Sequence, residues 1–121
     1  MKGLMLVYEA FGALDSPPDH VIELTAPPMV ETMHRYVGGY LEAVPHFDSV
    51  MHGAALHRCV AFCNEDGKGE NLAVNRRATV LWEAALQRRG RSLLNARGEV
   101  MDYLVGTIVI IIGDRQLLRN L

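Results

Sequence analysis

The segment AVNRRATVLWEAALQRRG, residues 73–90, has the pattern of a helix with a defined start and end. Asn75 is among the best residue types for a helix N-cap. Arg88 and Arg89 fall in the last turn, where cations favour the helix dipole, and Gly90 follows as a helix-ending residue. Apolar residues recur at the spacing of one helix face: Ala78, Leu81, Trp82, Ala85 and Leu86. We expect this face to pack on a sheet formed by the flanking hydrophobic runs.

Two strands are predicted upstream of this helix. Residues 57–63 (HRCVAFC) form the more clearly marked one, and the run NEDG at 64–67 predicts a tight turn after it. Residues 40–44 (YLEAV) predict the other strand, and the following Pro45 stops it or places it at an edge. The stretch 47–56 fits either a short strand or a loop.

An earlier helix is predicted before these strands. Thr25 or Ala26 would cap it, and the two prolines at 27–28 would occupy its first turn, where backbone N–H groups have no partner. A stripe of Met and Tyr side chains then follows helical spacing, which is more typical of core packing than of a ligand surface. Gly38 and Gly39 end the helix, because glycine adopts the left-handed conformation without penalty.

The outer parts of the chain supply the remaining strands. Residues 4–10 predict a central strand buried on both faces, and 20–24 predict a strand antiparallel to it. Residues 100–112 predict the last strand, with Gly106 as a bulge, and 116–121 fit one short helical turn. The prediction is therefore a single α+β domain over residues 1–121, with two helices packed on a mixed, mainly antiparallel sheet of about five strands in the order ββαββαβ.

Composition narrows the classes of function. The chain has 121 residues, of which 50% are hydrophobic and 21% charged, as in an ordinary globular domain. The net charge of -2 argues against bulk electrostatic binding of nucleic acid or membrane. In an extended strand Cys59 and Cys63 would lie roughly 13 Å apart, too far for a disulfide. With no secretory signal or membrane span evident, we expect a cytoplasmic location.

Four motifs carry a resemblance to a known family. In order they are VGGYLEAV (37–44), FCNEDGK (62–68), AVNRRAT (73–79) and VGTIVIIIGD (105–114). Together they resemble domain-of-unknown-function family 3846, and the similarity extends from residue 33 to about residue 114. The family consists of small proteins of phages and of bacterial and archaeal mobile or accessory genes. The resemblance implies a phage or mobile-element accessory protein acting in the host cytoplasm, and it implies no chemical activity.

The first candidate site is an anion site at the start of the helix that Asn75 caps. A helix N-terminus offers free N–H groups and a positive dipole end. Arg76 and Arg77 stand in this first turn, where positive charge is locally unfavourable, and Lys68 lies just upstream in the loop Gly67-Lys68-Gly69. Alternatively, both arginines are solvated or pair with nearby carboxylates. The loop lacks the spacing of a Walker motif, so ATP hydrolysis has little support.

The second candidate is a polar set formed by Glu42, Asn64, Glu65 and Asn75. Glu42 lies in an otherwise apolar strand, and a buried carboxylate there would require a partner. Such a set could line a small-molecule pocket or an acid–base site. In the structural alternative, Asn75 caps the helix, Asn64 shapes the turn and Glu42 faces solvent.

Two further groups of residues are weaker candidates. His52, His57, Cys59 and Cys63 are metal-binding residue types, but one strand cannot converge them on a single ion, so we expect no metal site. A cysteine nucleophile with a histidine base has no local signature. A basic face formed by Arg88, Arg89, Arg91 and Arg97 could contact RNA, DNA or an acidic protein, although no aromatic residues are interleaved with it.

The sequence thus favours a non-enzymatic accessory protein that binds a host macromolecule. The alternative is a small-molecule protein that binds a nucleotide or phosphate through the 67–69 loop and the helix N-terminus; an enzyme is least favoured. The expected partner is a host protein or a small phosphorylated ligand, with no cofactor, no membrane and little support for nucleic acid. The apolar run 108–112 could form a homo-oligomer interface unless it is central.

Overall fold

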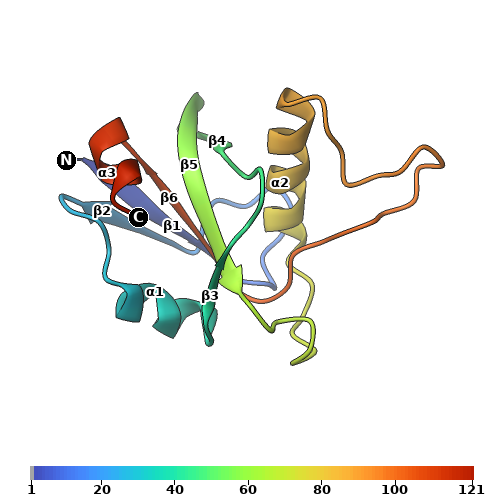
Figure 1. Cartoon of the computed structure of the whole chain (residues 1–121), viewed down its shortest axis with the longest axis horizontal. Coiled ribbons are helices and arrows are strands. Elements are labelled where there is room, and N and C mark those ends of the chain that lie inside the picture. Colours follow the sequence, from blue (N-terminus) through green and yellow to red (C-terminus); the bar gives the residue numbers. More distant parts are fainter. Residues whose placement is uncertain (1) are drawn as a thin grey trace.

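The computed structural model describes residues 2–121, which form six strands and three helices. The strands are β1 (Gly3–Tyr8), β2 (His20–Leu24), β3 (Leu41–Ala43), β4 (Ser49–His52), β5 (Ala55–Asn64) and β6 (Ile108–Gly113). The helices are α1 (Val30–Val37), α2 (Arg76–Arg88) and α3 (Arg115–Arg119). The protein is a single α+β domain, as the sequence predicts (Figure 1).

The sheet is antiparallel throughout, with the strand order β2-β1-β6-β5-β3, and β4 pairs with β5 outside this path. The two central strands pair in register, with Leu6 opposite Ile110. β5 is the longest strand and contacts three others: its first half pairs with β4, and its second half pairs with β6 and β3. It therefore links β4 and β3 to the central strand β6, and the two pockets proposed below as binding sites both lie beside it.

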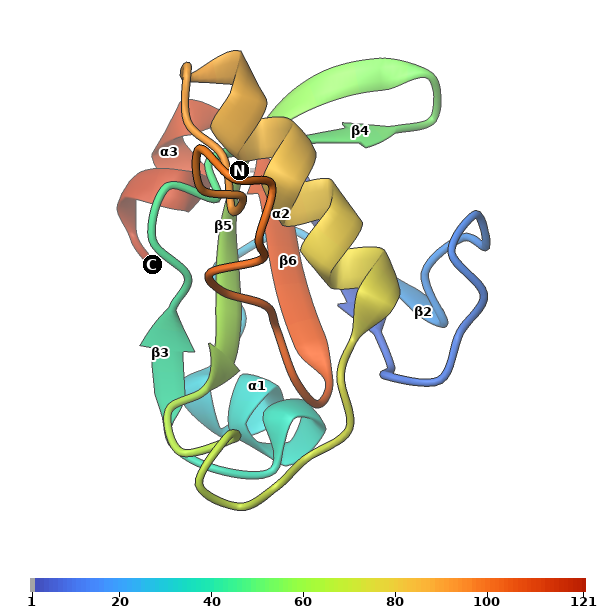
Figure 2. The same ribbon diagram turned by 90° about the vertical axis from the view of Figure 1, so that its right-hand side faces the viewer.

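Each face of the sheet is covered by different helices, so the domain has two hydrophobic cores (Figures 1 and 2). On one face α2 packs its side chains, including Trp82, over Leu6, Ile108 and Ile110. On the other face α1 and α3 cover Met5, Val109 and Ile111. Because neighbouring side chains on a strand point to opposite faces, the run 108–112 supplies both cores at once. Each such fully buried side chain stabilises the fold by roughly 1.5–3 kcal/mol.

Several predicted elements are confirmed. β1 is central, β2 is antiparallel to it, and α2 begins after its N-cap Asn75 and packs Trp82 on the sheet. Gly38 ends α1 in the left-handed conformation with φ 76°. The uncertain stretch 47–56 contains the strand β4, and the C-terminal turn is α3.

Two predictions are corrected. α1 starts at Val30 behind Met29, which offers no side-chain cap, so the two prolines precede the helix and are not in its first turn. Residues 100–107 are not part of the last strand, because Gly106 with φ 71° turns the chain immediately before β6. β6 is central and covered on both faces, which is the arrangement in which the sequence predicts no interface from its apolar run.

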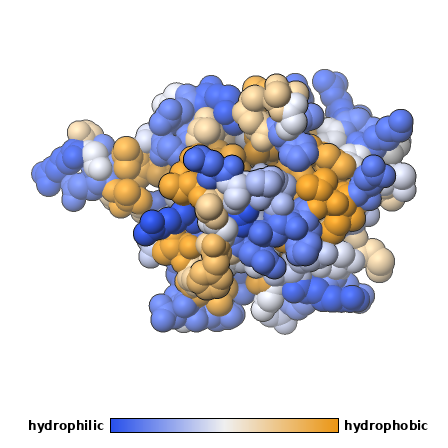
Figure 3. All heavy atoms as spheres, turned by 180° about the vertical axis from the view of Figure 1, so that it is seen from behind, coloured by the Kyte–Doolittle hydropathy of each residue, from blue (hydrophilic) through white to orange (hydrophobic). Residues whose placement is uncertain are grey.

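The residues between α2 and β6 form an arm that projects from the body (Figures 1 and 3). Leu94 and Val100 pair across it as an antiparallel bridge. The Glu83 carboxylate fixes its base by accepting from Ser92 Oγ at 2.7 Å and from the Leu93 N–H at 2.8 Å. Figure 3 shows a hydrophilic tip with hydrophobic surface nearer the base of the arm. No helix within residues 2–121 is long and apolar enough to cross a bilayer.

Candidate functional site

A pocket of about 250 Å³ lies where the end of β5 meets α2 and the return of the arm to the body. Four carboxylates and one lysine line it: Glu42, Glu65, Asp66, Asp102 and Lys68. Trp82 and Tyr103 add two aromatic rings, and Cys63 and Asn64 complete its polar wall. Three residues singled out from the sequence, Glu42, Asn64 and Lys68, therefore come together here with Glu65 of the predicted polar set.

Lys68 lies within the acidic and aromatic lining of this pocket. Its ammonium group pairs with the Asp102 carboxylate and lies 4.5 Å from the centroid of the Tyr103 ring. An ammonium group between a carboxylate and the face of an aromatic ring is favoured by both ion pairing and cation–π attraction. Within residues 2–121, the other carboxylates of the pocket, Glu42, Glu65 and Asp66, form no ion pair. The pocket thus carries an excess of negative charge.

Buried polar contacts hold the walls of this pocket. Asn64 is buried and shapes the turn after β5, because its side-chain oxygen accepts from the Asp66 N–H at 2.9 Å. Its amide nitrogen donates to the Val37 carbonyl at 3.4 Å, which ties the turn to α1. The Trp82 indole N–H donates to the Pro45 carbonyl at 2.9 Å and fixes the ring at the pocket wall. Glu42 itself is exposed, in agreement with the structural alternative for that residue.

Asn75 is fully buried and does more than cap α2. Its side-chain oxygen accepts from the Ala78 N–H at 3.0 Å, which is the expected cap. Its amide nitrogen also donates to the carbonyls of Tyr8 and Gly106, each at 2.9 Å. One side chain therefore joins the start of α2 to the end of β1 and to the turn before β6. Both the side-chain oxygen and the amide nitrogen of Asn75 are therefore used in contacts within the protein.

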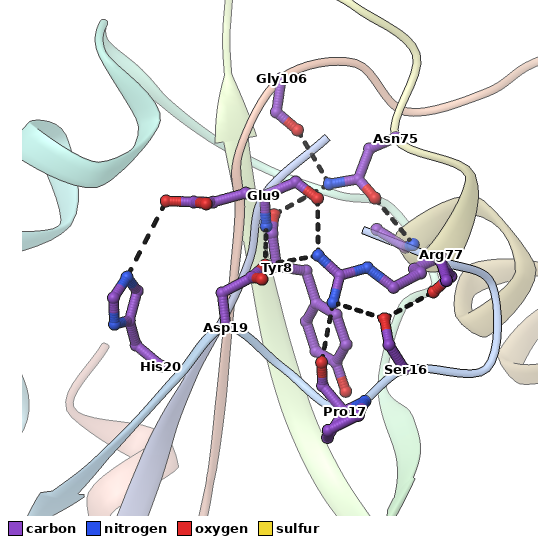
Figure 4. A network of polar contacts seen from close by, with 11 residues as sticks. Tyr8, Glu9, Ser16, Pro17, Asp19, His20, Asn75, Arg77 and Gly106 are labelled. Carbon is purple, nitrogen blue, oxygen red and sulfur yellow. Dashed lines mark hydrogen bonds and ion pairs between the residues drawn. The ribbon is translucent and has the colours of Figure 1, made fainter. Parts of the chain in front are cut away.

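Arg77 is buried among backbone carbonyls and holds the loop between β1 and β2 (Figure 4). Its guanidinium donates to the Pro17 and Glu9 carbonyls, both at 2.7 Å, and pairs with Asp19. It also lies 5.2 Å from the centroid of the Tyr8 ring. The side chain is 2% exposed, so it is a structural cation with its own counter-ion.

The predicted anion site is therefore not assembled. Lys68 lines the 250 Å³ pocket described above, which we call the Trp82 pocket, whereas Arg77 lines a separate hollow beside the 14–18 loop. Arg76 is exposed and lines neither hollow. The side chain of Asn75 occupies one of the free N–H groups that an anion would use. The local sequence places these residues together, but the fold separates them.

Asp102 and Tyr103 are the pocket residues that sequence reasoning missed. They fall inside the stretch predicted as the last strand, where alternate residues would have been assigned to a sheet face. The signal was an Asp–Tyr pair at the polar start of an otherwise apolar run. Together with the positive φ at Gly106, it indicates a loop that returns to the body.

The two cysteines are unsuited to nucleophilic catalysis at neutral pH. Both are free, and Cys59 is buried. Burial, with Asp48 nearby, raises the pKa of the Cys59 thiol to about 12. Burial and the Glu42 carboxylate raise the pKa of Cys63 to about 11, although Lys68 opposes them. The reactive thiolate is therefore scarce at both positions near pH 7. In residues 2–121 no group of His, Cys, Asp or Glu side chains is arranged to hold a metal ion.

Comparisons with known proteins identify the family of this chain. No curated protein and no solved structure matches the chain. A sequence model described as Domain of unknown function (DUF3846) matches residues 13–116. The matched region includes α1, α2, the four motifs at 37–44, 62–68, 73–79 and 105–114, and the Trp82 pocket. The chain therefore belongs to the DUF3846 family.

Proposed function

We propose that this chain is a small non-enzymatic binding protein that engages another macromolecule, and that the Trp82 pocket receives a positively charged side chain of this partner. As an accessory protein of a phage or mobile element, it would act on a host protein in the host cytoplasm. The observation that supports this most strongly is the lining of the pocket, where four carboxylates and two aromatic rings surround a single lysine.

The chemistry of the lining selects for a cation. Glu42, Glu65 and Asp66 form no ion pair within the described residues, so a guanidinium or ammonium group entering the pocket would find unpaired acceptors. A phosphate group would instead be repelled by the same carboxylates. Lys68 already uses Asp102 and Tyr103 in this way, which makes it an internal competitor for the partner's cation.

Lys68 separates the two functions that the sequence left open. If the pocket takes a cation, removing Lys68 frees Asp102 and the Tyr103 ring, so Lys68→Met should bind a basic peptide more tightly. If the loop instead binds a nucleotide, the same substitution removes the attracting charge and should weaken the binding of ADP. The two functions therefore predict opposite signs for one substitution.

The test uses calorimetric titration of the full chain with the peptide acetyl-Gly-Arg-Gly-amide, with acetyl-Gly-Gln-Gly-amide as the uncharged control. We expect binding of the Arg peptide only, weakened at least several-fold by Glu42→Gln or Asp102→Asn. Glu23→Gln, an exposed carboxylate of β2 outside the pocket, is the matched control and should change nothing. Equal binding of both peptides, or binding of ADP that depends on Lys68, would overturn the proposal.

A further inference from the structure

The opposite end of β5 carries another hollow, and the charge of its lining is opposite to that of the Trp82 pocket. It has a volume of about 470 Å³ and is lined by Asp48, Ser49, Leu56, Arg58, Cys59, Arg88, Arg89 and Leu118. Its charged groups are three guanidinium groups and one carboxylate, which leaves an excess of two positive charges. The hollow lies between the β4–β5 pair, the end of α2 and α3, so residues distant in sequence build it.

One of these cations is held in place by a neutral partner. The Arg88 guanidinium donates through Nε to Ser49 Oγ at 2.8 Å and through NH2 to the Ser49 carbonyl at 3.1 Å. Ser49 is in turn the cross-strand neighbour of Arg58. Arg88 is thus positioned beside Arg58 without neutralisation of its charge.

The three arginines differ in whether a carboxylate neutralises their charge. Arg89 pairs with the Asp48 carboxylate. Arg58 and Arg88 pair with no carboxylate anywhere in residues 2–121. Two unneutralised guanidinium groups in one hollow repel each other, and an anion bound between them would relieve this repulsion.

We propose that this hollow binds a phosphate group of a small molecule, with Arg58 and Arg88 as its ligands and Arg89 as a third cation. Guanidinium groups donate two parallel hydrogen bonds to phosphate oxygens, and an arginine that is already positioned loses less freedom on binding. Leu56 and Leu118 provide an apolar wall for the rest of the ligand. The site is distinct from the Trp82 pocket and stands whether or not that pocket binds a cation.

The test is a titration of the full chain with inorganic pyrophosphate, in which binding is monitored by the NMR chemical shifts of the backbone amides. Binding should weaken about tenfold in Arg58→Gln or Arg88→Gln, and Ser49→Ala should weaken it less because the guanidinium remains. Arg76→Gln removes an exposed arginine outside the hollow and is the matched control. Asp48→Asn should strengthen binding, because it removes the competing carboxylate and releases Arg89.

The effect of Asp48→Asn distinguishes a binding site from a structural cluster. If the Asp48–Arg89 pair is only structural, breaking it should not tighten the binding of pyrophosphate. Absence of pyrophosphate binding, or binding unchanged by Arg58→Gln and Arg88→Gln, would overturn the proposal. A single-stranded 12-nucleotide DNA that binds at these arginines while pyrophosphate does not would overturn the assignment to a small molecule.

Discussion

The Arg77 guanidinium in the first turn of α2 pairs with the Asp19 carboxylate at the start of β2, 58 residues away in the sequence. Asp19 also accepts from the Glu9 N–H at 2.7 Å, so its carboxylate connects the ends of the β1–β2 loop with the helix. Gly12 lies directly over the guanidinium, where any Cβ would clash with it. Arg77 thus joins this loop to α2 through polar contacts.

The neighbouring arginines of α2 should differ sharply in their effect on stability. Arg77→Ala leaves two backbone carbonyls without their donor and Asp19 without its counter-ion, and it should lower the free energy of unfolding by about 3–5 kcal/mol. Arg76→Ala removes an exposed side chain and should change it by less than about 0.5 kcal/mol. Urea unfolding of both variants tests this. Similar effects for the two substitutions would contradict the structural role assigned to Arg77.

Asn75 offers a second comparison, between its roles as a cap and as a donor. Asn75→Asp keeps an oxygen for the Ala78 N–H but cannot donate to the carbonyls of Tyr8 and Gly106. We expect it to lower the free energy of unfolding by about 2–4 kcal/mol, although Asp and Asn are equal as caps. Thermal or urea unfolding measures the loss. A variant as stable as the wild type would show that the cap alone matters.

Stability should fall in acid partly through Asp19. Although burial raises the pKa of Asp19, hydrogen bonds from the Glu9 N–H and Arg77 and the charge of Arg77 lower it below its ordinary value. The ordinary value, near 4, applies to the unfolded chain, so Asp19 contributes stability above about pH 4 that is lost as the pH falls through the folded pKa.

Urea unfolding from about pH 6 to pH 2 should therefore give a shallower acid limb for Asp19→Asn than for the wild type. The stability of the variant will still depend on pH in acid. Although burial raises the pKa of Glu83, hydrogen bonds lower it below its ordinary value, and hydrogen bonds also lower the pKa of Asp114. Identical slopes for the variant and the wild type would mean that the Asp19–Arg77 pair contributes nothing in solution.

The cysteines should react slowly with thiol reagents at neutral pH. With pKa values of about 12 for Cys59 and about 11 for Cys63, almost all of each thiol is protonated at pH 7. In Cys59→Ala, which leaves only Cys63, the rate should rise about tenfold per pH unit between about pH 7 and pH 10. A disulfide-exchange reagent followed by absorbance measures it. A rate that levels off near neutral pH would indicate an activated thiol and reopen nucleophilic catalysis.

Local sequence rules correctly predicted the helices and strands that are determined by residues within or next to the element itself. The cap at Asn75, the helical spacing to Leu86 and the glycine ends of α1 and α2 all act within one or two turns, and each is confirmed. The central position of β1 follows from an apolar run without alternation. The family resemblance added the order of the motifs but no chemistry.

The candidate site could be predicted only in part, because it depends on contacts between distant residues. Arg76 and Arg77 look alike in sequence, yet only one meets the β1–β2 loop, and nothing near residue 77 indicates that Asp19 will pair with it. From its local sequence Lys68 was predicted to bind an anion. In the fold it contacts Asp102 and Tyr103, which lie at least 34 residues later in the chain. The sign of the pocket's charge therefore emerged only from the assembled fold.

Trp82 is the single tryptophan of the chain and lines the proposed pocket, so its fluorescence reports directly on whether a cation enters there. Titration of the wild type with acetyl-Gly-Arg-Gly-amide should give a saturable change that Glu42→Gln combined with Asp102→Asn abolishes and that Lys68→Met shifts to lower peptide concentration. No change with the Arg peptide, or the same change with the Gln peptide, would contradict the claim that this pocket recognises a positively charged side chain.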